Sequence, residues 1–126
     1  MIILVYSLAG VGLSITPEPA LIHVGDRVVW KLLFFNGRLA QSIKIKCTIY
    51  FEKSNPFKGN SNKDFTAYGQ SIKYPPASPV SEENGEVIID AGKASEAGHY
   101  KYGIRITNAE TEEIISDDDP ALIVLP

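Results

Sequence analysis

The residues of this chain that could do chemistry are few and far apart in the sequence. There are two histidines, His23 and His99, one cysteine, Cys47, and one dense acidic run at 117–119. A serine hydrolase needs Ser, His and an acid in register, and neither histidine stands in a G-x-S-x-G or related context. We therefore expect a protein that is not an enzyme and has no catalytic residues.

Metal chemistry is not expected either. Around Cys47, apolar residues alternate with Lys44, Lys46 and Thr48, which places the thiol on the inward face of a strand. A single cysteine forms no intrachain disulfide, and a buried one behaves as a small hydrophobe. The acidic run at 117–119 lacks EF-hand spacing, so we interpret it as a solvated turn before the last strand. The sequence predicts no metal and no other cofactor.

The composition fits one folded domain spanning residues 1–126. Hydrophobic residues make up 44% of the chain and charged residues 21%, which is ordinary for a globular protein. The net charge is −3, whereas a nucleic-acid reader is normally basic, so no nucleic-acid partner is expected. The apolar run at 1–14 is too short and too interrupted by glycine to span a membrane, and we interpret it as a first strand.

Strand patterns recur along most of the chain. Two short apolar runs are separated by the Gly25-Asp26 corner, and the second contains Trp30, the only tryptophan. Asn36-Gly37 predicts a hairpin between two long β-rich runs, and Asn84-Gly85 is a second such corner. Only 90–96 carries a weak helix signal. The pattern indicates an all-β fold, a two-sheet antiparallel Greek-key β-sandwich. Strands are expected near residues 2–6, 12–16, 20–24, 27–35, 42–51, 65–73, 86–90, 98–107 and 120–125.

Pro19-Ala20-Leu21, then Val24-Gly25-Asp26, Val28 and Trp30, resemble the opening of cupredoxin-like domains. The stretch 97–102, Ala-Gly-His-Tyr-Lys-Tyr, is similar to that family's G-x-Y-x-Y strand. The family's usual function is electron transfer through copper held by two His, one Cys and a weak axial ligand. The family clusters Cys, His and Met after that strand, and no such residue follows Tyr102 here. The resemblance therefore implies a cupredoxin-like sandwich that lacks the copper ligands.

The stretch 96–102 also resembles the D-x-G-x-Y-x-C corner of immunoglobulin-like domains, with Glu96 for Asp and Tyr102 for Cys. That resemblance implies that the Tyr100 hydroxyl bonds back to upstream backbone. Fibronectin type III domains are similar in having one core tryptophan and a tyrosine on a late strand. These resemblances favour an extracytoplasmic or cell-surface location.

Two groups of apolar residues are candidates for binding. The region 52–85 is a long loop-rich excursion, and such segments tend to be functional. It contains the aromatic candidates Phe57, Phe65, Tyr68 and Tyr74. The second group is Leu33 and Phe35, which share the second apolar face of the strand at 27–35. That face is either covered or makes contact with a partner or another copy of the chain.

We therefore expect a non-catalytic interaction or assembly module that binds a protein partner, or a second copy of itself, through exposed aromatics. The alternative is a small-ligand or carbohydrate-binding sandwich that stacks sugars on the same aromatics. A metal-dependent redox protein is a third and weaker hypothesis. Lys44, Lys46, Lys101 and Arg105 would form a basic stripe if their strands are neighbours, although such stripes are usually the polar face of a half-buried sheet.

Overall fold

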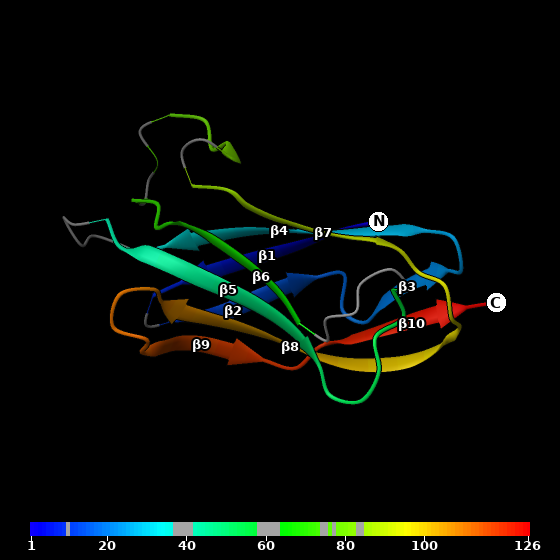
Figure 1. Ribbon diagram of the computed structural model, residues 1–126. Coiled ribbons are helices and arrows are strands. Elements are labelled where there is room, and N and C mark those ends of the chain that lie inside the picture. The colour runs from blue at the N-terminus through cyan, green and yellow to red at the C-terminus, as the bar shows by residue number, and fades with distance from the viewer. Residues whose placement is uncertain (10, 37–41, 58–63, 74–75, 77, 83–84) are drawn as a thin grey trace.

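The computed structural model of the chain is a β-sandwich of two sheets (Figure 1). It describes all residues except 10, 37–41, 58–63, 74–75, 77 and 83–84. The strands are β1 (Ile2–Leu8), β2 (Gly12–Thr16), β3 (Ala20–His23), β4 (Arg27–Phe35), β5 (Lys44–Phe51), β6 (Asp64–Gln70), β7 (Val87–Lys93), β8 (Gly98–Asn108), β9 (Ile114–Asp118) and β10 (Ala121–Leu125). Nine of them match the ranges expected from the sequence to within a few residues, and β9 is additional.

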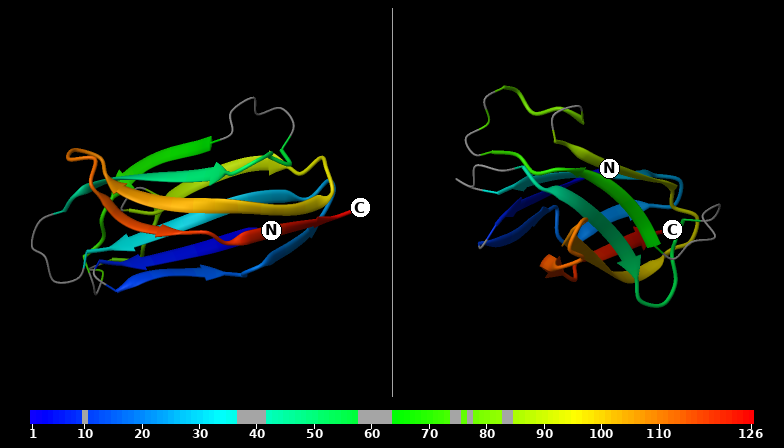
Figure 2. Two further views of the ribbon diagram at one scale, coloured as in Figure 1. Left: turned by 90° about the horizontal axis from the view of Figure 1, so that it is seen from below. Right: turned by 60° about the vertical axis from the view of Figure 1, so that its left-hand side comes forward.

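One sheet has four strands in the order β2-β1-β4-β7, and the other has six, in the order β3-β10-β8-β5-β6 with β9 also paired to β8. In the left view of Figure 2 the long β8, yellow to orange, runs beside the path of β9 and β10, orange to red. The sheets are mixed, because β1 pairs parallel with β4 and β3 pairs parallel with β10. The expectation of purely antiparallel sheets was therefore wrong. Alternating residue patterns report the faces of a strand and not the direction of its neighbours.

The Gly25-Asp26 corner carries the chain from one sheet to the other. Gly25 has φ 97°, a conformation that favours glycine, and the Asp26 N–H donates to the His23 carbonyl over 3.0 Å. The Asp26 carboxylate accepts a hydrogen bond of 2.9 Å from the His23 N–H. Gly25 N–H and Asp26 C=O also bond to the backbone of Ala94. β3 therefore ends in the six-stranded sheet and β4 begins in the four-stranded one.

The predicted hairpin at Asn36-Gly37 does not form, because β4 and β5 belong to different sheets. Gly37 and Asn84 lie outside the described residues. The Asn36 N–H donates to the Ile72 carbonyl over 3.1 Å, so β4 continues into contact with the segment before β7. Both β4 and β5 have one fully apolar face, and each can bury that face by packing across the core. Burial of the apolar faces of β4 and β5 in different sheets therefore decided the pairing, and the local turn signal at Asn36-Gly37 did not.

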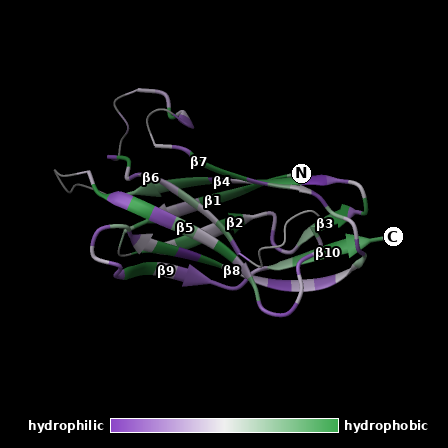
Figure 3. Ribbon diagram, viewed as in Figure 1, coloured by the Kyte–Doolittle hydropathy of each residue, from purple (hydrophilic) through white to green (hydrophobic). Residues whose placement is uncertain are grey.

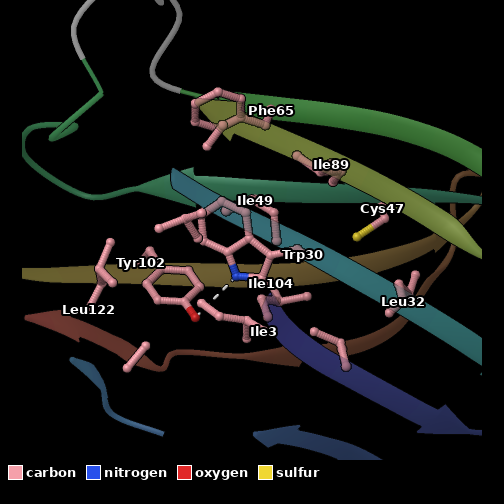
Figure 4. Close-up of a cluster of buried hydrophobic side chains, with 14 of the residues drawn as sticks. Ile3, Trp30, Leu32, Cys47, Ile49, Phe65, Ile89, Tyr102, Ile104 and Leu122 are labelled. Atoms are coloured by element: carbon pink, nitrogen blue, oxygen red, sulfur yellow. Dashed lines mark hydrogen bonds between the residues drawn. The ribbon is translucent and has the colours of Figure 1, made fainter. Parts of the chain in front are cut away.

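The core fills the space between the sheets with the inward residues of each strand. In β4 these are Val28, Trp30, Leu32 and Phe34, all 2% exposed or less. Figure 4 shows Trp30 among side chains from both sheets, including Ile3 and Tyr102. Trp30 Nε1–H donates to the Tyr102 hydroxyl over 3.3 Å, which satisfies a buried donor. Trp30 thus connects the two sheets at the centre of the sandwich.

Two local expectations near the end of the chain were wrong. Asp117 and Asp118 lie in β9 and not in a turn, and β9 pairs with β8 along Ile104–Thr107. The weak helix signal at 90–96 corresponds to the end of β7 and a bend. There Gly92, with φ 85°, stands at a register shift of the β4–β7 pairing. No helix among the described residues is long and apolar enough to cross a membrane.

Candidate functional site

Phe57 and Phe65, two of the aromatics expected at a binding surface, are core residues. Phe57 is 1% exposed and Phe65 is 9% exposed. Phe57 packs edge-on against Trp30 at 6.2 Å between ring centroids and against Phe65 at 6.0 Å. Such contacts stabilise beyond the burial of area alone. The expectation that these two rings are exposed was wrong, because the core needs them to cover the end of Trp30.

The backbone around Phe57 is tied to the sandwich. The Phe57 N–H donates to the Asn55 side-chain oxygen over 2.7 Å. The Pro56 carbonyl accepts two hydrogen bonds of 2.8 Å from Ser95, one from its backbone N–H and one from its hydroxyl. The segment just after β5 is therefore an ordered part of the fold. The polar composition of the region 52–85 had predicted a loop-rich excursion there.

Of the other two aromatics in the region 52–85, Tyr68 does not join this core cluster. Tyr68 lies on the outer face of β6 and is 58% exposed. Tyr74 lies outside the described residues. The excursion therefore does not present one aromatic patch: two of its rings face the core, and one faces outward on the six-stranded sheet.

Leu33 and Phe35 lie on the outer face of the four-stranded sheet, as the alternation in β4 predicted. Across the parallel pairing with β1, Leu33 stands opposite Tyr6 and Phe35 stands opposite Leu8. Both β4 residues are half-buried, whereas Tyr6 is 42% exposed. The structure thus brings the two predicted residues together with β1 residues that sequence reasoning did not select.

We call this surface the outer apolar face. Its members come from β1, β4 and β7 and all point away from the core: Ile2, Leu4, Tyr6, Leu8, Val29, Leu33, Phe35 and Ile88. The β1 members were missed because β1 is apolar on both faces, so its sequence does not tell inside from outside. Figure 3 shows the contrast: β1 is green over much of its length, whereas β5 changes between purple and green.

Charged residues lie both at one end of the outer apolar face and within it, where Lys31 stands between Leu4 and Ile88. Arg27 and Asp90 form an ion pair of 2.8 Å at that end, with both side chains about half exposed. Lys31 is half-buried. A lysine stem can lie along apolar surface while its ammonium reaches solvent. Large contiguous apolar patches on a protein surface often mark interaction sites, so this face is a candidate for one.

The outer face of the six-stranded sheet has the opposite character. The guanidinium of Arg105 contacts one carboxylate oxygen of Asp117 through Nε at 3.1 Å and Nη2 at 3.0 Å, and it stacks over the ring of Tyr50 at 5.1 Å. The Tyr50 hydroxyl donates to the other oxygen over 2.9 Å. These bonds to Asp117 raise the pKa of Arg105, and desolvation, followed by the hydrogen bond to Asp117, raises the pKa of Tyr50. Gly103 completes the cluster, because a Cβ there would collide with the Tyr50 ring.

The condition for the predicted basic stripe is met, since β5 and β8 pair along their length. Lys44 and Lys46 lie on the outer face of β5, and Lys101 and Arg105 lie on the outer face of β8. Arg105 is neutralised by Asp117, so the stripe is interrupted. It is a polar sheet face with separate cationic positions.

The residue types that the cupredoxin family uses as copper ligands occur here as His23, His99, Cys47 and Met1, and the structure does not bring them together. Cys47 is 2% exposed in the core, and burial raises the pKa of its thiol to about 12. His23 and His99 are exposed on strands separated by β10, and Met1 is exposed at the start of β1. Among the described residues, no cluster of three or more His, Cys, Asp or Glu side chains could hold a metal ion.

One detail implied by the immunoglobulin resemblance is present. The Tyr100 hydroxyl donates to the Glu96 carbonyl over 3.1 Å, which closes the turn before β8. Comparison of the chain with protein-family models, with curated proteins and with solved structures finds no match. The strand pairing therefore describes the fold as a mixed two-sheet β-sandwich, and the candidate sites are argued from the geometry of the structure alone.

Proposed function

We propose that this protein is a non-catalytic assembly module that packs the outer apolar face against a second copy of the chain. The observation that carries the proposal is the row of apolar side chains that β1 and β4 turn away from the core, with Tyr6 opposite Leu33 at its centre. Half-buried sheets usually place polar residues at such positions. In β1 and β4 most of these outward positions are apolar instead.

The geometry favours a second sheet as the occupant. Sheets pack face to face at about 10 Å, and a two-fold axis would place this same face on both sides of the interface. The Arg27–Asp90 pair lies at the end of the face, which leaves the centre free of fixed charge pairs. A fully buried interface core is apolar and often contains Tyr and Phe, as this face does.

The finer assignment of the scaffold is part of the proposal. A cupredoxin-like domain without copper ligands is supported by the Gly25-Asp26 corner leading to a core Trp30 and by two parallel strand pairs, which depart from the antiparallel sheets of immunoglobulin domains. The Tyr100 corner favours the immunoglobulin-like alternative. Either scaffold is compatible with the proposed function, because the outer apolar face is formed by the pairing of β1 with β4.

Among the residues that the structure describes, the carbohydrate-binding alternative keeps one stacking residue, Tyr68. Phe57 and Phe65 are buried and cannot stack on a sugar, whereas Tyr68 is exposed on the other sheet. That surface is separate from the outer apolar face, so both can operate in one molecule.

The test is the mass of the protein in solution, measured by light scattering from low micromolar to millimolar concentration. We expect the wild-type chain to associate and Leu33→Lys to shift the equilibrium to the monomer. The matched control is Leu21→Lys, since Leu21 is 53% exposed on the edge strand β3 of the other sheet. A wild-type protein that remains monomeric throughout, or loss of association in both variants, would refute assembly through this face.

A further inference from the structure

A shallow hollow of about 390 Å³ opens on the outer face of the six-stranded sheet. Its floor is formed by β5, β6 and β8, which lie side by side in that sheet. The residues that line it include Lys46, Thr48, Tyr68, Arg105, Thr107 and Asn108. The volume is at the lower end of the range of small-ligand sites. The hollow therefore combines an aromatic ring, cations and hydroxyl groups on one rigid surface.

The register of the strands orders these groups in rows. Tyr68 stands directly opposite Lys46, and Lys46 stands directly opposite Thr107, so one row crosses three strands. Thr48 stands opposite Arg105 in the next row. A sugar ring has about the same span as the distance between two strands, about 5 Å. A ring over Tyr68 would thus bring its substituents above Lys46.

Tyr68 is suited to stacking. Tyr68 is 58% exposed and stands on β6, the edge strand of the six-stranded sheet. The ammonium of Lys44 lies 5.6 Å from the ring centroid and makes a cation–π contact with it. The face of an aromatic ring is electron-rich and attracts the weakly positive C–H groups of a pyranose ring.

Lys46 supplies the charge. Arg105 is already neutralised by Asp117, but Lys46 forms no ion pair within the described part of the chain. Its side chain is half-buried between Tyr68 and Thr107, so it is less free than a surface lysine. Glu112 also lines the hollow; it lies just before β9, which pairs with β8 on the side opposite β5 and β6 and so away from Tyr68. An anionic group is therefore attracted to the Lys46 side of the hollow.

We propose that this hollow binds an acidic saccharide. A sugar ring stacks on Tyr68, its carboxylate or sulfate pairs with the Lys46 ammonium, and its hydroxyls bond to Thr48 and Thr107. The site lies on the sheet opposite the outer apolar face, so it does not depend on assembly and can be tested in the Leu33→Lys background.

The test is calorimetric titration of the protein with three probes: an oligogalacturonate, a heparin-derived oligosaccharide and neutral cellohexaose. At least one acidic probe is expected to bind, and the neutral one about fivefold more weakly or not at all, since it lacks the charge pair with Lys46. Lys46→Gln should weaken binding of the acidic probe about fivefold and Tyr68→Ala about tenfold, while the unfolding temperature stays near that of the wild type.

The control variant is Lys101→Gln, which removes the same charge from the same sheet. Lys101 lies six residues from Thr107 along β8, about 20 Å away, and lines a different hollow. Its affinity for the acidic probe should stay within about twofold of the wild type. Equal weakening in Lys101→Gln and Lys46→Gln would show a diffuse charge effect and overturn the site. Absence of binding by all three probes, or equal binding of the neutral one, would also overturn it.

Discussion

Phe57 and Leu33 are both large apolar residues in regions expected to bind a partner, yet they lie in opposite environments. Phe57 follows β5 in a polar, loop-rich stretch and packs on Trp30 in the core. Leu33 lies inside the regular strand β4 and points outward beside Tyr6. An aromatic residue in a loop is therefore weak evidence of a surface. An apolar residue at the outward position of a strand whose inward face is already filled is stronger evidence.

The physical reason is that a sandwich has open ends. The sheets cover each other's inner faces, but the rings at the ends of the strands need cover from the connections. Phe57 supplies it next to Phe51, with ring centroids 6.1 Å apart. The outward face of β4 needs no cover for the core to be complete, and its apolar residues are the basis of the proposed assembly contact. Substitutions at Phe57 and at the outward residues of β4 can test this difference.

The largest effect is expected from Phe57→Ala. Removing a fully buried ring costs about 3–5 kcal/mol of unfolding free energy, because the cavity left against Trp30 and Phe65 refills only partly. Urea denaturation measures it, with Phe57→Leu as a control that keeps most of the volume and loses less. A loss of unfolding free energy below about 1 kcal/mol would place Phe57 outside the core, and it would then no longer differ from Leu33 in burial.

The second prediction compares the unfolding free energies of substitutions at two adjacent residues of β4. Leu32 is 2% exposed and Leu33 is half-buried on the other face. Leu32→Ala should lower the unfolding free energy by about 2–5 kcal/mol and Leu33→Ala by about 1 kcal/mol or less. Both are measured at a concentration where the wild-type chain is monomeric. Equal losses would mean that the outer face is covered by the chain itself.

The two sheets show how far sequence reasoning extends. Alternation correctly placed Cys47 inward in β5 and placed Leu33 and Phe35 together on one face of β4, because one buried face imposes a period of two. It could not orient β1, which is apolar on both faces, and so it missed Tyr6. It also missed β9, whose acidic end pairs with Arg105: an ion pair between strands has no signature in the sequence of either strand.

The outcome at Asn36-Gly37 has a similar cause. A turn signal describes four residues, whereas the choice of sheet depends on where each long strand can bury its apolar face. The candidate site residues also fall into those that local periodicity predicts and those that depend on long-range packing. Leu33 and Phe35 followed from strand periodicity, and Phe57 and Phe65 were misplaced because their contacts are long-range.

The third prediction concerns pH and the closed core. The thiol of Cys47 has its pKa raised by burial from 9.0 to about 12, and burial raises the pKa of Tyr102 from 10.0 to about 12. Both groups ionise more readily in the unfolded chain, so the stability they support is complete below pH 9 and is lost as pH rises toward 12. At about pH 10.5 the thiol alone costs about 2 kcal/mol relative to pH 7.

The check is the unfolding free energy of the wild-type protein and of Cys47→Ala at both pH values. The variant is less stable at pH 7 because it leaves a small cavity, but it should lose about 2 kcal/mol less than the wild type between the two pH values. If the two proteins lose the same amount, the thiol is accessible to solvent in the native state, and the interior is less closed than the burial of Phe57 and Cys47 implies.

The smallest effect is expected at Tyr68, the one described aromatic of the excursion that faces outward. Tyr68→Ala removes a ring that is 58% exposed and a cation–π contact with Lys44, so the loss should be about 0.5–1 kcal/mol. The same denaturation series that contains Phe57→Ala measures it, eleven residues along the chain. A small loss at Tyr68 beside a large one at Phe57 would show that the direction of the ring, and not its place in a loop-rich segment, decides its role. A loss of several kcal/mol at Tyr68 would instead make it a structural residue, and its exposure would no longer argue for a ligand.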